Sequence, residues 1–261
     1  MIGSWRGYGA DWTRRKASWL LTRMTDLIWP PVSPLSGEMV SSHGALSPAD
    51  WQKLSFLEAP WCARCGLPFD YDLGEGMECA PCQADHSPLE HVRAALVYDE
   101  ASRGLVLAFK HGGRTEGLAS FAPWMARAGQ ALLSDADGLI PVPLHPQRLR
   151  QRGYNQSLLL AKALAKVSHV RVEPHLLARV KRTSTQDGKG VAARQRNVAG
   201  AFKIRESMLY KISGKSFVLI DDVYTTGATL KACARALKRA GAAKVSAIAL
   251  ARVIKPIDTT V

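Results

Sequence analysis

Four of the five cysteines form two Cys-x-x-Cys pairs, Cys62/Cys65 and Cys79/Cys82. Two such pairs, separated here by thirteen residues, are typical of a tetrahedral zinc site in which four thiolates bind the metal and a small module folds around it. A site closed by four thiolates has no position for water, so the expected Zn²⁺ is structural. A redox pair or a disulfide is the alternative, but a thioredoxin-like motif is single and begins a helix. The fifth cysteine, Cys233, is expected in the core.

A second group of reactive side chains lies in Phe217–Thr229, which reads FVLIDDVYTTGAT. An apolar strand expected over Phe217–Ile220 brings Asp221 and Asp222 to its carboxyl end, and a Thr-Thr-Gly-Ala-Thr loop then leads into a helix. Backbone amides and hydroxyls at a helix N-terminus form a cradle for phosphate, and Gly227 permits close backbone approach. Adjacent carboxylates accept hydrogen bonds from two ribose hydroxyls or hold Mg²⁺ through water. The segment therefore predicts a site for a phosphorylated sugar.

The formal net charge of +13 is distributed unevenly along the 261 residues. Residues 141–215 alone carry 16 basic and 3 acidic side chains, a surplus equal to that of the whole chain. A cationic surface of this kind attracts phosphate groups, either of a small molecule or of nucleic acid. A solvated basic face without a ligand is the alternative.

Composition excludes several classes of protein. A chain with 47% hydrophobic and 22% charged residues is globular, which rules out wholesale disorder. No apolar stretch is long enough to span a membrane, and the longest apolar run near the N-terminus, Ser18–Leu21, is too short for a signal peptide. Five cysteines in a chain of this length do not indicate a secreted disulfide scaffold. We therefore expect a soluble cytoplasmic protein.

From residue 91 onward, apolar strands alternate with helical patterns. The expected strands are Val92–Tyr98, Leu139–Leu144, Phe217–Ile220 and Lys244–Ala251. The expected helices are Phe121–Leu133, Gln156–Val167 and Thr229–Ala240. This alternation implies right-handed crossovers and a mainly parallel sheet, in which ligands bind at the carboxyl ends of the strands.

The loop after Asp222 resembles the phosphoribosyl-pyrophosphate (PRPP) motif of type I phosphoribosyltransferases. The wider pattern resembles the ComF family of competence-associated, phosphoribosyltransferase-like proteins. Three further stretches carry this resemblance: CARCGLPF at Cys62–Phe69, PVPLHPQRLRQRGYNQ at Pro141–Gln156, and TSTQDGKGVAARQRNVAGAF at Thr183–Phe202. Together they cover about residues 60–252. The resemblance implies an α/β fold with a mainly parallel sheet of the type I phosphoribosyltransferase kind and a small N-terminal zinc-ribbon module.

The resemblance also implies roles for individual residues. The PRPP-binding residues it implies, with the ribose-binding acids first and the 5′-phosphate loop after them, are Asp221, Asp222, Tyr224, Thr225, Thr226, Gly227, Ala228 and Thr229. Pyrophosphate would lie near Arg148 and Arg152, and a mobile hood over Thr183–Asn197 would bring in Arg194 and Arg196. Guanidinium groups suit phosphate oxygens, and a hood that excludes water protects an oxocarbenium-like centre. Lys110-His111-Gly112-Gly113 also matches a turn of the family, without an implied role.

Two features depart from the family pattern. Where a further set of cysteine knuckles is common, the aligned positions are Ser33, Ser36, Ser47 and Asp50. Serine hydroxyls do not replace thiolates on zinc, so we expect this upstream metal site to be lost. In the hood, Lys189 and Gly190 stand where the family usually has Leu-Ser.

These patterns divide the chain into three parts. Residues 1–29 are expected to form an amphipathic helix, in which the apolar positions recur at helical spacing from Trp12 onward. This helix packs on the body of the protein or, as the alternative, rests on an anionic membrane surface through residues 12–29. Residues 30–90 form the zinc-ribbon module, with one intact four-cysteine site, and residues 91–261 form the phosphoribosyltransferase-like domain.

The predicted function is binding of PRPP with Mg²⁺ and transfer of its 5-phosphoribosyl group to an acceptor that the sequence does not identify, with release of pyrophosphate. Orientation and electrostatic stabilisation would carry the catalysis, because no general base stands out. The alternative is a non-catalytic protein of DNA uptake that binds PRPP or single-stranded DNA. A regulatory subunit that acts through partner contacts is a third interpretation. DNA binding alone does not require the Asp-Asp and Thr-rich loop.

Overall fold

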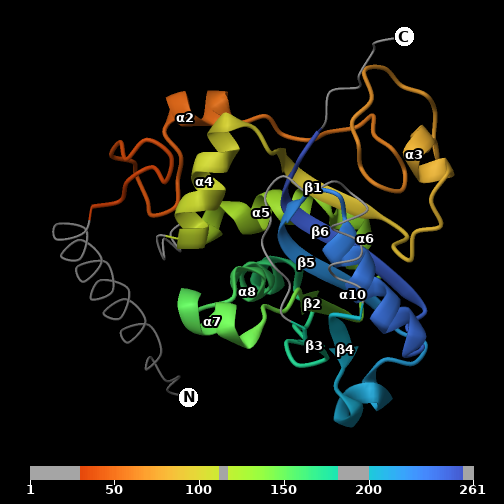
Figure 1. Cartoon of the computed structure of the whole chain (residues 1–261). Coiled ribbons are helices and arrows are strands. Elements are labelled where there is room, and N and C mark those ends of the chain that lie inside the picture. The colour runs from red at the N-terminus through yellow and green to blue at the C-terminus, as the bar shows by residue number, and fades with distance from the viewer. Residues whose placement is uncertain (1–29, 112–116, 182–199, 255–261) are drawn as a thin grey trace, which may run out of the picture.

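The computed structural model of the chain describes residues 30–111, 117–181 and 200–254 (Figure 1). Within these residues, four parallel strands form the central sheet in the order β1-β6-β5-β2. Their bounds are β1 (Val92–Val97), β6 (Lys244–Arg252), β5 (Ser216–Tyr224) and β2 (Gly138–Pro141). The strands are almost continuously apolar and buried, as expected when helices cover both faces of a parallel sheet. The predicted α/β fold with a mainly parallel sheet is confirmed.

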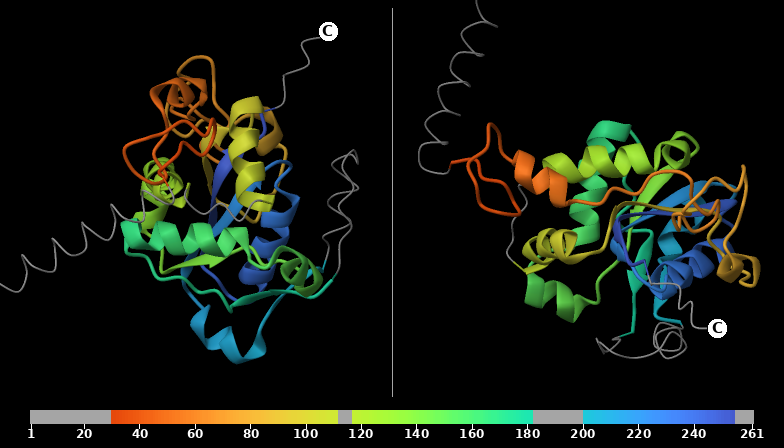
Figure 2. Two further views of the ribbon diagram at one scale, coloured as in Figure 1. Left: turned by 90° about the vertical axis from the view of Figure 1, so that its left-hand side faces the viewer. Right: turned by 90° about the horizontal axis from the view of Figure 1, so that it is seen from above.

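Alternate residues of β5 contribute to two hydrophobic cores, one on each face of the sheet. Val218 and Ile220 pack with α4 (Glu100–His111), α5 (Leu118–Ala128) and α8 (Gln156–Ser168). Phe217 and Leu219 pack on the other face, with α10 (Ala228–Arg239) and the strands β3 (Leu177–Arg179) and β4 (Phe202–Ile204). Cys233 of α10 is fully buried in this second core, as predicted. Figure 2 shows the helices on both sides of the sheet.

Three predicted elements differ from the observed ones by more than one residue at an end. Strand β5 does not end at Ile220 but continues to Tyr224, because it remains paired with β6 up to Tyr224↔Arg252. Strand β2 ends at Pro141, before Pro143, whose nitrogen has no proton for a ladder hydrogen bond. The helix expected over Phe121–Leu133 is two helices, α5 and α6 (Gln130–Ser134), because the backbone leaves helical geometry at Gly129 (φ −104°, ψ 15°).

Other elements were not among those expected from the sequence. Helix α4 begins with reciprocal hydrogen bonds between Asp99 and Ser102, each 2.9 Å long, and buries Leu105, Val106 and Phe109 against the sheet. Short helices occupy α2 (Pro48–Lys53), α3 (Ala80–Gln83), α7 (Pro146–Arg152) and the 3-10 helix η1 (Glu206–Lys211). Strands β3 (Leu177–Arg179) and β4 (Phe202–Ile204) pair antiparallel on either side of residues 182–199. The predicted N-terminal helix (1–29) and the hood residues Arg194 and Arg196 lie outside the described residues.

Residues 30–90 are joined to the β1 side of the sheet (Figures 1 and 2). The amide of Leu57 donates to the Ala95 carbonyl at 2.9 Å, and the Val97 amide donates to the Ser55 carbonyl at 2.8 Å. Gly66 (φ +68°) comes so close to β1 that a Cβ there would lie 2.6 Å from the Val92 carbonyl oxygen. The cysteine-bearing segment is therefore packed on the sheet. Among the helices of the described residues, none is both long and apolar enough to cross a bilayer.

Candidate functional site

Strand β5 carries the two acids and continues directly into the loop that precedes α10 (Figure 1). Asp221 and Asp222 therefore lie within the carboxyl-terminal half of the strand, and not beyond its end as expected. Successive side chains of a strand point to opposite faces. Lys110 of α4 pairs with Asp222. Asp221 accepts a hydrogen bond from Ser157 of α8, and it also lies close enough to Cys233 of α10 for its charge to raise the pKa of that thiol further above the value set by burial.

Asp221 is held by two hydrogen bonds to one carboxylate oxygen. Ser157 Oγ donates to Oδ1 at 3.1 Å, and the Asp222 amide donates to the same atom at 3.0 Å. Burial nevertheless raises the pKa of Asp221 to about 7, and the neighbouring Asp222 carboxylate acts in the same direction. Lys110 and the two hydrogen bonds oppose this rise. A partly buried carboxyl of this kind is stabilised as an anion when a cation binds beside it.

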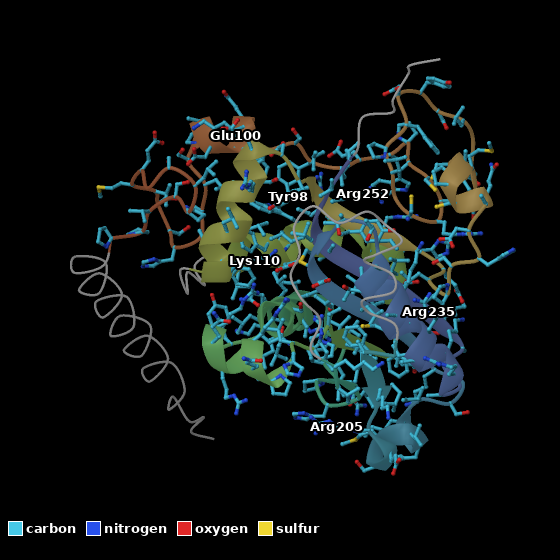
Figure 3. All side chains as sticks on the ribbon, viewed as in Figure 1. Tyr98, Glu100, Lys110, Arg205, Arg235 and Arg252 are labelled. Carbon is cyan, nitrogen blue, oxygen red and sulfur yellow. The ribbon has the colours of Figure 1, made fainter. Side chains whose placement is uncertain are left out.

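Lys110 lies at the carboxyl end of α4, with its Nζ 3.2 Å from Asp222 Oδ2 (Figure 3). This end of α4 is fixed by residues that precede and begin α8. Tyr154 Oη donates to the Phe109 carbonyl at 2.5 Å, and Gln156 Nε2 donates to the Lys110 carbonyl at 3.2 Å. The Gly-Tyr-Asn-Gln segment of the sequence thus positions the cation that pairs with Asp222.

We refer to Tyr224–Thr229 as the phosphate loop. Thr225 is exposed, and Thr226 and Thr229 are half-buried. Gly227 (φ +72°) is the N-cap residue of α10, and it has no side chain that could compete with an anion for the first-turn amides. A Cβ at Gly227 would lie 2.8 Å from Tyr224 Oη, so the Tyr224 ring packs directly against the turn. A loop that ends in a glycine at a helix N-terminus can accept an anion through the first-turn amides.

Basic side chains of α7 and β3 lie near Asp221. Burial lowers the pKa of Arg179 in β3, Arg148 acts in the same direction, and Asp221 opposes them, which places these three charges in one neighbourhood. The Arg179 guanidinium also lies over the Phe202 ring, 5.3 Å from its centroid. Arg152 Nη1 donates to Gln156 Oε1 at 3.3 Å, so this arginine helps to fix the start of α8.

Sequence reasoning missed two residues of this neighbourhood, Ser157 and Arg179, and assigned no role to Lys110. Ser157 directly follows the Tyr-Asn-Gln segment and could have been suspected as a polar residue at a helix start. Arg179 carries no local signal, because its place beside Asp221 depends on how β3 packs.

The four predicted cysteine ligands converge. The Sγ atoms of Cys62, Cys65, Cys79 and Cys82 all lie within 4.8 Å of one another. Cys65 and Cys79 Sγ are 3.7 Å apart, close to the ~3.8 Å edge of a tetrahedron with zinc–sulfur bonds of ~2.3 Å. The site therefore fits structural zinc. We call residues 62–66 the zinc knuckle.

Hydrogen bonds from backbone amides favour the thiolate form of Cys62. Burial opposes ionisation of Cys62, but backbone amides, including those of Cys65 at 3.4 Å and Cys79 at 3.3 Å, lower its pKa to about 7. Burial raises the pKa of Cys79 to about 11 and that of Cys82 further. Metal binding must therefore displace protons from these thiols.

The positions aligned with the upstream cysteines also converge, around a carboxylate. Ser33 Oγ and Ser36 Oγ donate to Asp50 Oδ2 at 2.6 and 2.5 Å, and the Ser36 amide donates to the same atom at 3.0 Å. Lys53 Nζ lies 3.0 Å from Oδ1, and the Asp50 amide donates to Ser47 Oγ at 3.2 Å. Burial alone would raise the pKa of Asp50, but these donors hold it well below its usual range.

Comparison with known proteins finds a family match for the N-terminal part of the chain and another for the C-terminal part. Residues 155–258 match the phosphoribosyl transferase domain family, and residues 24–84 match the double zinc ribbon domain family. The fold and the site thus define a phosphoribosyltransferase-type domain with an N-terminal zinc ribbon.

Relatives identify the family. The chain is 30% identical over 213 residues to DNA utilization protein YhgH of Escherichia coli O6:H1, which covers 74% of this chain and 84% of the relative. It is 28% identical over 226 residues to competence protein F of Haemophilus influenzae (82% and 92% covered) and 28% identical over 211 residues to competence protein ComFC of Bacillus subtilis (77% and 81% covered). The chain belongs to the ComF family of competence-associated proteins.

Proposed function

We propose that the protein binds PRPP with Mg²⁺ at the carboxyl edge of its sheet and transfers the 5-phosphoribosyl group to a nucleophilic acceptor, with release of pyrophosphate. The observation that carries this proposal is the continuity of β5: the acid pair Asp221–Asp222 leads within the same strand to the phosphate loop and the N-terminus of α10. A ligand with a phosphate and vicinal hydroxyls suits both halves of this segment.

In this proposal the amides and hydroxyls of the phosphate loop bind the 5′-phosphate, and Asp221 and Asp222 accept hydrogen bonds from the ribose hydroxyls. Carboxylate oxygens are also suitable partners for Mg²⁺ and its bound water. When bound with the diphosphate, Mg²⁺ would offset the negative charge of the leaving group. Arg148 and Arg152 of α7 supply guanidinium groups for the diphosphate oxygens.

The reaction exchanges one bond at the anomeric carbon for another. The bond from this carbon to the pyrophosphate oxygen breaks, and its electron pair leaves with pyrophosphate. The lone pair of the acceptor forms the new bond, and the proton of the acceptor passes to solvent. The chain's part is to orient the ribose and to stabilise the charges that separate. Ser157 and Lys110 serve this purpose because they fix the two carboxylates.

Pyrophosphate release tests this proposal. Purified protein is incubated with PRPP and Mg²⁺ in the presence of panels of nitrogen and oxygen nucleophiles, and pyrophosphate is measured. We expect release above the background of PRPP hydrolysis with at least one panel, and loss of this release in Asp222→Asn. Asp135→Asn is the matched control. Asp135 is an exposed acid that pairs with Lys244 at the start of β6, whereas the two acids of the site lie toward the end of β5. Equal release from the Asp222→Asn variant would contradict the assignment.

The names of the relatives favour a second candidate, a role in handling DNA. Proteins named for DNA utilization and for competence are related to this chain over most of its length. The basic stretch 141–215 includes the three arginines of α7, Arg148, Arg150 and Arg152. A single strand could follow such a surface through its phosphates, with or without turnover of PRPP. Titration with a labelled oligonucleotide tests this candidate.

A further inference from the structure

Arg252, which Figure 3 labels, is the last residue of β6 and contacts both the zinc knuckle and the phosphate loop. Its Nη1 donates to the Cys65 carbonyl oxygen, and its Nη2 donates to Cys65 Sγ at 3.5 Å. On the other side, Arg252 Cζ lies 4.9 Å from the centroid of the Tyr224 ring. Only 8% of Arg252 is exposed, so the planar guanidinium depends on these protein contacts in place of water.

Tyr224 extends this series of contacts into the phosphate loop. It is 7% exposed, and its ring packs against Gly227, where the backbone turns into α10. The backbone around the pair is tied as well, because the Val253 amide donates to the Tyr224 carbonyl at 2.9 Å. The contacts thus run in order from the metal ligand Cys65 through Arg252 and the Tyr224 ring to the turn at Gly227.

We propose that Arg252 is a positioning residue that couples the zinc knuckle to the phosphate loop, so that an intact knuckle holds the loop in the form that accepts a phosphorylated sugar. The identity of that ligand rests on the proposed function, but the coupling itself does not. The physical reason is that the Arg252 guanidinium is held by hydrogen bonds to Cys65 on one side and by the Tyr224 ring on the other. If Cys65 moves, the guanidinium loses two acceptors in a buried place and must shift, and the Tyr224 ring then loses its support.

Hydrogen exchange of the backbone amides measures this coupling without any ligand. The variant Arg252→Met keeps the length of the side chain but removes the charge and the donors. We expect exchange in residues 223–231 to become about tenfold faster, because the loss of hydrogen bonds from a charged, buried group weakens the local structure. Exchange in α8 should not change, and zinc content should stay at one ion per chain. Faster exchange everywhere would indicate a general structural role and would overturn the proposal.

Three further variants sharpen the test. Arg127→Met is the matched control, because Arg127 also lies over an aromatic ring, 5.4 Å from the centroid of Phe56, but on an exposed surface. It should leave exchange in residues 223–231 unchanged. Arg252→Lys keeps the charge and should give an intermediate rate, which preserves the test if the methionine variant loses zinc. Tyr224→Phe keeps the ring and should behave like the wild type. An unchanged rate in both Arg252 variants refutes the coupling.

Ligand binding then separates the coupling from the proposed function. With the wild type saturated by zinc, we expect PRPP and Mg²⁺ to bind about tenfold more weakly to Arg252→Met, a difference of about 1.4 kcal/mol. In cobalt-substituted protein, the thiolate-to-cobalt absorption should shift in this variant, because Cys65 Sγ loses its donor. Failure of the wild type to bind PRPP would refute the proposed function alone. Faster exchange without weaker binding would refute the role of the coupling in ligand recognition.

A second inference is independent of the first and concerns Asp50. We infer that the Asp50 carboxylate takes the place of a metal at the centre of the upstream half of the double zinc ribbon. The side chains that would be ligands converge on it: Ser33 and Ser36 donate to one oxygen, and Ser47 caps the helix that carries it. Ser33 and Asp50 are fully buried, so the cluster is the interior of this half.

Restoring thiols tests this inference. The fourfold variant Ser33→Cys, Ser36→Cys, Ser47→Cys, Asp50→Cys should bind two zinc ions per chain. The twofold variant Ser33→Cys, Ser36→Cys should bind only one. A folded fourfold variant that binds only one zinc ion would refute the inference. Asp50→Ala provides a test that does not depend on that variant: exchange in residues 33–53 should become much faster with unchanged zinc content. Unchanged exchange would refute a central role for the carboxylate.

Discussion

Replacing Asp221 by asparagine should stabilise the ligand-free protein increasingly as the pH rises. Burial raises the pKa of Asp221 from 3.8 to about 7, so the folded protein retains a proton that the unfolded chain releases. The contribution of Asp221 to the free energy of unfolding then falls between about pH 4 and pH 7, by up to about 4 kcal/mol. Asparagine does not titrate, and its Oδ1 still accepts hydrogen bonds from Ser157 and the Asp222 amide.

Urea unfolding at two pH values measures this effect. In zinc-containing, Mg²⁺-free buffer, the stability advantage of Asp221→Asn over the wild type should grow by about 3 kcal/mol between about pH 5 and pH 8. Asp135→Asn is the control: Asp135 is exposed and 3.8 Å from Lys244, so its effect should stay below about 1 kcal/mol at both pH values. A difference between Asp221→Asn and the wild type that does not change with pH would refute the reasoning.

Three further predictions concern zinc, the loop and the basic stretch. Replacing Cys79 and Cys82 by serine should reduce bound zinc from one ion per chain to none, as measured by elemental analysis, while circular dichroism retains the signal of the α/β domain; retained zinc would contradict the four-cysteine site. Gly227→Val should abolish PRPP binding measured by calorimetry, whereas Gly214→Val, with a similar φ of +70° but open space around it, should not; equal binding would contradict the close packing of the loop. Replacing the three arginines of α7 by alanine should make single-stranded DNA binding, measured by fluorescence anisotropy, less dependent on salt. The slope of log K against log salt concentration should fall in magnitude by about 0.7 for each phosphate that the variant no longer neutralises. An unchanged slope would show that these arginines do not contact the DNA.

The elements that the sequence predicts well are those whose signal is local. The four cysteines indicate their site through spacing alone, and the run from Phe217 to Thr229 carries strand, acids, glycine and helix start in order. Helix Gln156–Val167 has its apolar residues at helical spacing and differs from α8 by a single residue at its end. For such segments, short-range pattern and final structure agree.

The parts that the sequence does not predict depend on partners distant along the chain. Strand β5 extends through both acids because β6 pairs with it there, and no residue within β5 reveals this pairing. Lys110 and Ser157 meet the two acids from helices more than sixty residues away. Arg252 directly follows an apolar strand in the sequence, and its contacts with Cys65 and Tyr224 form only when the ribbon packs on the sheet.

Isothermal titration calorimetry with PRPP, with and without Mg²⁺, tests the proposed site most directly. The wild type should bind PRPP in a Mg²⁺-dependent manner. The double variant Asp221→Asn, Asp222→Asn should lose a few kcal/mol of binding free energy, since each charge-assisted hydrogen bond contributes roughly 1.5–3 kcal/mol. The change of volume is small, so the fold should survive. Equal affinity of the wild type and the double variant, or no binding to the wild type at millimolar PRPP, would contradict the site.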